Sequence, residues 1–152
     1  MNAIAPTLTP QIIGEVENAH LAHLALTLAP SGLTRIQWIA LSVTMTGGGT
    51  ADVDALVQRL VGGLKVSAEA ARDAVAGLVA TARLVEDGEE DGARVRATAA
   101  GEVLFAELRE ATTGVVANAY GGIPEADLAV AARVLTQIAG RLNEQLVARL
   151  AA

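Results

Sequence analysis

Two predicted helices separated by only two residues constrain the fold more than any other feature of the sequence. Thr50 and Ser67 can each cap a helix, because a hydroxyl accepts a hydrogen bond from a backbone N–H of the first turn. Only Lys65 and Val66 separate the two helices, and the second is expected to continue to about Arg83. Apolar residues recur at helical spacing in both: Leu56, Leu60 and Leu64 in the first, and Ala71, Ala74, Val75 and Leu78 in the second. The pattern predicts two consecutive helices joined by a tight turn.

Two further helix starts precede this pair. The dipeptide Thr9–Pro10 can open a helix, because Thr caps well and Pro is tolerated where the backbone N–H has no helical partner. We expect this helix to reach about Leu28, where an Ala-Pro-Ser-Gly stretch stops it. The stretch Thr34–Gln37 is a capping box for a second helix, which should end at the three glycines of residues 47–49.

The composition agrees with a mostly helical protein. Hydrophobic residues make up 52% of the 152 residues, with one Trp, one Tyr and one Phe, so the core must consist mainly of aliphatic side chains and alanine. This length suits one domain with a real core. The absence of cysteine excludes disulfides, thiolate nucleophiles and Cys-ligated zinc. Without a signal-peptide pattern or a run of 18 apolar residues, we expect a cytoplasmic protein that does not enter a membrane.

A short β-hairpin is predicted after the fourth helix. Leu84–Val85 and Arg94–Thr98 have the pattern of strands, and the turn between them contains glycine and is strongly acidic. Five acids occur within six positions, and two arginines follow on the returning strand. The acids are Glu86, Asp87, Glu89, Glu90 and Asp91.

The C-terminal part predicts two long helices. One should run from about Ala99 to Ala119, and Gly121–Gly122 should break it before Pro124 opens the last helix. In that helix a mainly apolar set of residues recurs at helical or heptad spacing: Leu128, Ala131, Leu135, Ile138, Leu142, Gln145 or Leu146, and Leu150. A stripe of this kind lies outside a compact four-helix unit, and its apolar side chains must be buried against another surface. We therefore favour a homodimer interface over packing within the chain alone.

In this order, the elements resemble the MarR family of winged helix-turn-helix regulators over nearly the whole chain. The matching pieces are Leu33–Gln37, Leu60–Ser67, Leu78, Asp91, Arg94 and Thr98–Gly101. The resemblance implies a mostly α fold of a single domain over residues 1–152, with a winged helix-turn-helix core at about 34–98, a small hairpin wing, and dimerisation helices at about 1–30 and 99–152. It further implies a homodimer that binds double-stranded DNA at a pseudo-palindromic operator, with Ala68 to Arg83 in the major groove, and a cleft for a small aromatic or anionic ligand.

Two departures from the family pattern favour an alternative. A glycine commonly ends the recognition helix in the left-handed conformation, but this chain has Ala82 and Arg83 there, which predicts a steric cost and a rearranged exit. Residues 50–98 hold six basic and nine acidic side chains, a balance of −3, whereas DNA affinity depends mainly on phosphate neutralisation. The alternative is a winged-helix protein that has lost DNA binding and serves interaction or small-molecule binding.

The candidate DNA contacts lie at the start of the recognition helix and on the returning strand of the wing. Arg72 could address guanine or phosphate, and Glu69 could accept from cytosine N4, although both could equally form a solvated face with local pairing. Arg94 and Arg96 should share one side of their strand, where they could clamp phosphate or neutralise the turn acids. The full set is Ser67, Ala68, Glu69, Ala71, Arg72, Asp73, Arg94 and Arg96.

The candidate ligand contacts are His20, His23, Trp38 and Met45, where a neutral imidazole could hydrogen-bond a carboxylate or a phenol. Core or interface packing is the competing interpretation. Glu17 and His20 form a Glu-x-x-His motif, with His23 three residues further on, and such a motif can contribute metal ligands. A single motif falls short of a complete metal site, so a metal-responsive regulator ranks only third among the interpretations. We expect no cofactor and no catalysis, because no nucleophile triad, P-loop or dinucleotide fingerprint is present.

Overall fold

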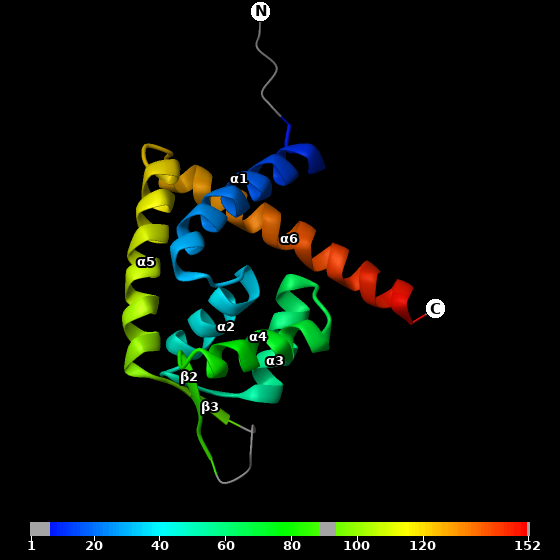
Figure 1. Ribbon diagram of the computed structural model, residues 1–152. Coiled ribbons are helices and arrows are strands. Elements are labelled where there is room, and N and C mark those ends of the chain that lie inside the picture. Colours follow the sequence, from blue (N-terminus) through cyan, green and yellow to red (C-terminus); the bar gives the residue numbers. More distant parts are fainter. Residues whose placement is uncertain (1–6, 89–93, 152) are drawn as a thin grey trace, which may run out of the picture. The chain divides into compact units, whose positions relative to one another are not determined.

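A computed structural model describes residues 7–88 and 94–151, and these residues form two compact units. The first unit ends at Val115 and contains every element that precedes α5 together with most of α5. The second unit begins at Val116. Figure 1 shows the elements in chain order. Their bounds are α1 (Pro10–Leu28), the 3₁₀ turn η1 (Ala29–Ser31), α2 (Arg35–Thr46), β1 (Thr50–Asp52), α3 (Val53–Leu64), α4 (Ala68–Ala80), β2 (Leu84–Glu86), β3 (Arg94–Ala97), α5 (Ala99–Tyr120) and α6 (Glu125–Leu150).

Local capping explains where the first helices begin. The Thr9 hydroxyl accepts from Ile12 N at the start of α1, and the Ser67 hydroxyl accepts from Ala70 N at the start of α4. At α2 the Thr34 side chain accepts from Gln37 N while the Gln37 side chain accepts from Thr34 N, so the capping box is complete. These three predicted helix starts are confirmed.

The start of α3 differs from the prediction. Asp52, not Thr50, caps this helix, and its carboxylate accepts from Ala55 N at 2.8 Å. Thr50 instead begins β1, which pairs antiparallel with β3 through Thr50 opposite Arg96. The prediction of Thr50 as a cap was wrong, because pairing with a strand more than 40 residues further along the chain gives this backbone hydrogen-bond partners that a local pattern does not contain.

The small sheet has three strands in the order β1-β3-β2, all antiparallel. The predicted hairpin is its β2–β3 part, with Leu84 opposite Ala97 and Glu86 opposite Val95. The third strand, β1, adds pairing to the outer side of β3, so β3 is central and both of its edges are satisfied. Val95 and Ala97 point into the core while Arg94 and Arg96 are exposed.

The core of the first unit lies where α2, α3 and α4 pack with the sheet and the start of α5. Its largest fully buried side chains are aliphatic, as the composition predicts, and include Leu41, Leu60, Leu78, Leu84, Val57 and Val95. Trp38 stacks on Phe105 with ring centroids 5.7 Å apart, and the Arg109 guanidinium lies over the Phe105 ring. This aromatic pair joins α2 to α5.

The exit from α4 uses a left-handed alanine. Ala82 has φ 54°, a left-handed conformation that a non-glycine residue adopts only at a steric cost. The predicted steric cost is therefore present at this turn. The Thr98 hydroxyl donates to Ala82 O at 2.7 Å and accepts from Gly101 N at 3.0 Å, which ties this turn to the start of α5. A Cβ on Gly101 would lie 2.1 Å from Arg83 O, so only glycine allows this approach.

The second unit consists mainly of α6. All residues of α6 are described, and none is buried within the chain. Its exposed large apolar residues are Val130, Leu135, Leu142, Leu146, Val147 and Leu150. Of the predicted stripe, Leu128 and Ile138 are half-buried. None of the helices in the described part of the chain is long and apolar enough to cross a membrane.

Candidate nucleic-acid interface

The start of α4 presents a polar face to solvent. Ser67, Ala68, Glu69, Arg72 and Asp73 are exposed, and only three residues separate α4 from α3. The sixth predicted contact on this helix, Ala71, is fully buried in the core. Its side chain therefore cannot reach a DNA groove, because the helical period that exposes position 72 turns position 71 inward. The remaining five residues form the α4 face: Ser67, Ala68, Glu69, Arg72 and Asp73.

The cation of the α4 face is held from the neighbouring helix. The Arg72 Nη2 atom lies 2.9 Å from Asp54 Oδ1, and both side chains are more than half exposed. The partner predicted within α4 was Glu69, three residues earlier, but the observed partner belongs to the first turn of α3. Asp54 was not a sequence candidate, because nothing local relates positions 54 and 72; only the crossing of α3 and α4 brings them together.

The two wing arginines lie on one side of β3, as their alternation with Val95 predicted, but their partners differ. Arg94 donates from Nη2 to the Thr50 hydroxyl at 3.4 Å, across the β1–β3 pair. Arg96 places Nε 3.8 Å from Asp87 Oδ1 and also donates to Ala97 O at 3.4 Å. One turn acid is thus neutralised by Arg96. Exposed pairs of this kind contribute little stability, so both arginines remain available to an outside anion.

The other predicted acids of the wing tip, Glu89, Glu90 and Asp91, lie outside the described residues. Glu86 is exposed at the end of β2, opposite buried Val95. Among the described residues, the winged helix therefore carries acids beside its arginines on both the α4 face and the wing.

Lys65 is a further cation beside the α4 face that the predicted set omitted. It adopts the left-handed conformation, φ 57°, at the C-terminus of α3, and its ammonium donates to Gly62 O at 2.5 Å. This contact places a positive charge at the negative end of the α3 dipole, next to the turn into α4. The sequence signal was available, since a lysine directly after a predicted helix and before a capping serine occupies a C-cap position.

The structure separates the four predicted ligand residues. Trp38 is 7% exposed and belongs to the core through its stack on Phe105, and Met45 packs half-buried against the same core. On α1, His23 is exposed, while His20 is half-buried with Nδ1 3.0 Å from Val16 O. Core packing is thus the observed role of Trp38, and the four side chains line no common cavity among the described pockets.

The acid of the Glu-x-x-His motif is engaged elsewhere. The Glu17 carboxylate lies 3.3 Å from Nη2 of Arg35, at the start of α2. Within the described residues, no group of three or more His, Asp or Glu side chains could hold a metal ion.

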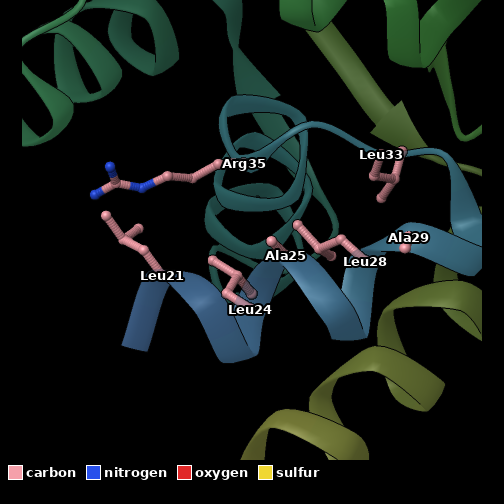
Figure 2. A pocket seen from close by; sticks show the side chains of 7 residues that line it. All are labelled: Leu21, Leu24, Ala25, Leu28, Ala29, Leu33 and Arg35. Carbon is pink, nitrogen blue, oxygen red and sulfur yellow. The ribbon is translucent and has the colours of Figure 1, made fainter. Parts of the chain in front are cut away.

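A cavity of about 210 Å³ lies between α1 and the start of α2 (Figure 2). Its walls are mainly aliphatic, and Arg35 is the one charged side chain among those that line it. In Figure 2 Arg35 extends beside Leu21 at one end, and Leu33 lies near Ala29 at the other. An apolar hollow with a guanidinium at its rim suits a small molecule with an apolar body and an anionic group. The lining residues are Leu21, Leu24, Ala25, Leu28, Ala29, Leu33 and Arg35.

Neither a model of a known protein family nor a curated protein matches the sequence. Solved structures do match. A MarR-family transcriptional regulator from Listeria monocytogenes in complex with 26-mer DNA is similar at a TM-score of 0.75 and 17% identity, over 92% of each chain. A MarR-family regulator from Silicibacter pomeroyi gives 0.68 and 18%, over 85% of this chain and 86% of that one.

A third similar structure is BpsR of Bordetella bronchiseptica, whose DNA binding is regulated by 6-hydroxynicotinic acid. The TM-score is 0.68 at 17% identity, over 89% of this chain and 99% of that one. The predicted MarR-like winged-helix fold is confirmed by these likenesses: six α-helices and a small antiparallel sheet in the described residues, in the order that the fold requires.

Proposed function

We propose that this protein is a homodimeric, ligand-responsive transcriptional regulator that binds a pseudo-palindromic site in double-stranded DNA. The observation that carries the proposal is the α4 face, a solvent-exposed helix start that follows α3 after a short turn in a MarR-like winged helix. In helix-turn-helix proteins the second helix lies in the major groove and its first residues reach the base edges. The similar Listeria regulator was solved with DNA, which supports the same partner here.

The β2–β3 wing would then contact the DNA backbone. Arg94 and Arg96 are exposed on one side of β3, where guanidinium groups can neutralise phosphate. With Lys65 and Arg72, they supply the positive charge that the α4 face and the wing offer to DNA. A regulator of this kind would act in the cytoplasm, where its operator lies.

The homodimer is supported by α6. A helix with six exposed large apolar residues needs a cover, and a second copy of the same helix supplies one by symmetry. Two α4 faces related by a two-fold axis would explain a pseudo-palindromic site. In this proposal the chain is one functional domain, with the winged helix at about 34–98 and dimerisation helices at about 1–30 and 99–152.

The ligand would occupy the cavity between α1 and α2. We propose a small aromatic acid, with its ring against the leucines and its carboxylate on Arg35, as the chemistry of the lining suggests. The regulation of BpsR by a hydroxylated aromatic acid supports this class. His20 and His23 lie on α1, which also supplies several of the lining residues, and they stay candidates for a second polar contact.

A thermal-shift panel of hydroxylated benzoic and nicotinic acids tests the ligand. A binder at 100-fold its Kd stabilises the folded state by about 2.7 kcal/mol, which raises Tm by several degrees. Trp38 fluorescence should respond in the same titration, because α2 carries both Trp38 and Arg35. Arg35→Gln is the matched variant and should remove the shift. If no acid in the panel raises Tm, the ligand-responsive part of the proposal fails.

One observation favours a second candidate function, a winged-helix interaction protein that does not bind DNA. Arg72 and Arg96 are both held by acids of the same chain, and the winged-helix segment is acidic overall. An acidic interface repels phosphate but attracts a basic partner protein.

Fluorescence anisotropy with genomic fragments across a salt series separates the two functions. For a regulator, the wild type binds some fragments more tightly than others, and neutralising Glu89, Glu90 and Asp91 to Gln, Gln and Asn strengthens binding to every duplex alike. A wild type that binds no fragment at low salt, beside a neutralised variant that binds all of them, would instead identify the interaction protein.

A further inference from the structure

Arg72 and Asp54 form an ion pair that spans the turn between α3 and α4. The distance from Arg72 Nη2 to Asp54 Oδ1 is 2.9 Å, and the two residues are 18 positions apart in the sequence. Side-chain exposures of 56% for Arg72 and 78% for Asp54 place the pair at the surface. Exposed pairs contribute little to stability, so the fold does not require this one.

In the structure the pair gives the guanidinium one orientation, directed toward α3. A free arginine side chain samples many rotamers, and ordering it on binding costs free energy that weakens recognition. Asp54 belongs to a different helix, the first turn of α3, and holds the guanidinium from outside α4. A partner on α4 itself, such as Glu69, would draw Arg72 along the helix axis instead.

The contact leaves most of the guanidinium available. A guanidinium has five N–H donors in a planar fork, and the pair with Asp54 engages only Nη2, so the remaining donors can still bind an acceptor. A guanine presents O6 and N7 on its major-groove edge, which is the acceptor pair that a planar guanidinium fits. A phosphate would also accept these donors, but it does not require a fixed orientation.

We propose that Asp54 is a positioning residue that orients Arg72 for a guanine edge, so that Arg72 reads a G·C base pair instead of contacting phosphate. This inference rests on the proposed DNA binding and adds to it a base preference and the residue that sets it. Asp54 itself touches no DNA in this arrangement. Its carboxylate also disfavours a backbone contact nearby, because a phosphate beside it is repelled.

The test uses the full-length wild type and duplexes selected from a random pool by repeated binding. Anisotropy is measured on the selected duplex and on duplexes in which each G·C pair is replaced in turn, in both half-sites. For the wild type, one such replacement should weaken binding roughly tenfold or more, the range of one bidentate arginine–guanine contact.

Three variants then test whether Arg72 and Asp54 together recognise that G·C base pair. Asp54→Asn should reduce the wild-type discrimination there by about five- to tenfold, and Arg72→Lys should do the same because lysine lacks the planar fork. The double variant should lose no more than either single one, since both act through one contact. Glu110→Gln removes an exposed acid of α5, equal in charge to Asp54, and should leave discrimination unchanged.

The outcomes separate this inference from the proposed function. If Asp54→Asn strengthens binding to selected and random duplexes alike, as a simple loss of negative charge would, Asp54 merely repels phosphate and the positioning role is wrong. Unchanged discrimination in Asp54→Asn overturns it equally. If the wild type enriches no sequence at all, the proposed function fails, and the base preference fails with it.

Discussion

The faces of α4 and α6 are both exposed, but their chemistry differs. The α4 face is polar, and its arginine is already engaged with Asp54 of the neighbouring helix. The α6 surface displays six large apolar side chains, and no residue of this helix is buried within the chain. Water solvates the first surface at little cost, whereas the second keeps apolar area in water until another surface covers it.

The contrast indicates that the apolar surface of α6 must be covered by a partner, whereas the α4 face can remain exposed to water until a ligand binds. A polar helix start is stable alone and can bind a charged partner reversibly. An apolar stripe favours a permanent partner, such as a second copy of the chain. Substitutions on α6, at the turn that leaves α4 and the start of α5 that contacts it, and on the α4 face and the wing test how these regions work, in order of decreasing effect.

Charges placed on the apolar surface of α6 should have the strongest effect. Replacing Leu135 and Leu142 with Glu would bury unpaired carboxylates in the proposed seam, so we expect monomers or unfolded protein by light scattering and circular dichroism. Thr136→Glu with Asn143→Glu is the matched control, because it adds two acids at exposed polar positions of the same helix. A stable dimer of the leucine double variant would rule out this interface.

Gly101→Ala should destabilise the contact between the start of α5 and the turn that leaves α4. The added Cβ would lie 2.1 Å from Arg83 O, a backbone atom, so the start of α5 must shift. We expect a loss of at least about 2 kcal/mol in the free energy of unfolding. Gly114→Ala lies in the same helix, and its added Cβ would meet no atom within 4 Å beyond the neighbouring helix backbone, so it should be neutral or stabilising by up to about 1 kcal/mol. Equal Tm values for the two variants would contradict the close approach.

Substituting the arginine of the α4 face and substituting an arginine of the wing should affect DNA binding in different ways. Arg72→Ala should weaken the specific duplex preferentially, by about 1–3 kcal/mol, while leaving random duplexes nearly unaffected. Arg94→Ala should weaken all duplexes alike and reduce the salt slope by about one contact. Anisotropy across a salt series measures both. If the two variants behave identically, the distinction between base reading at α4 and phosphate contact at the wing is wrong.

A weaker effect is expected at Ala82, in the turn that leaves α4. Glycine tolerates φ 54° without a steric cost, so Ala82→Gly should stabilise the protein by up to about 1 kcal/mol, less the extra chain entropy of the unfolded state. Ala80→Gly, at the last helical residue of α4, should destabilise it by up to about 1 kcal/mol. Thermal melting of the pair gives the sign of each change, and a lower Tm for Ala82→Gly than for the wild type would show that Ala82 carries no strain.

Features that depend on neighbours in sequence were predictable from the residues. The capping box of Thr34 and Gln37 and the Ser67 cap each join positions three apart, so the local pattern contains the whole interaction. The same holds for the alternation of Arg94, Val95 and Arg96, because a strand has a period of two. The order of these elements resembles the MarR family, and this resemblance led to the prediction of a winged-helix fold.

Interactions between residues that are far apart in sequence depend on the folded chain. β1 exists because β3 pairs with it, Asp54 meets Arg72 because α3 crosses α4, and Trp38 is buried because α5 brings Phe105 onto α2. Ala82 adopts an unfavourable φ because the Thr98 hydroxyl and the glycine at position 101 hold the chain there. The physical reason is common to all four: the interaction partners are brought together only by the tertiary structure, and the free energy of the whole fold can outweigh a local preference of about 1 kcal/mol.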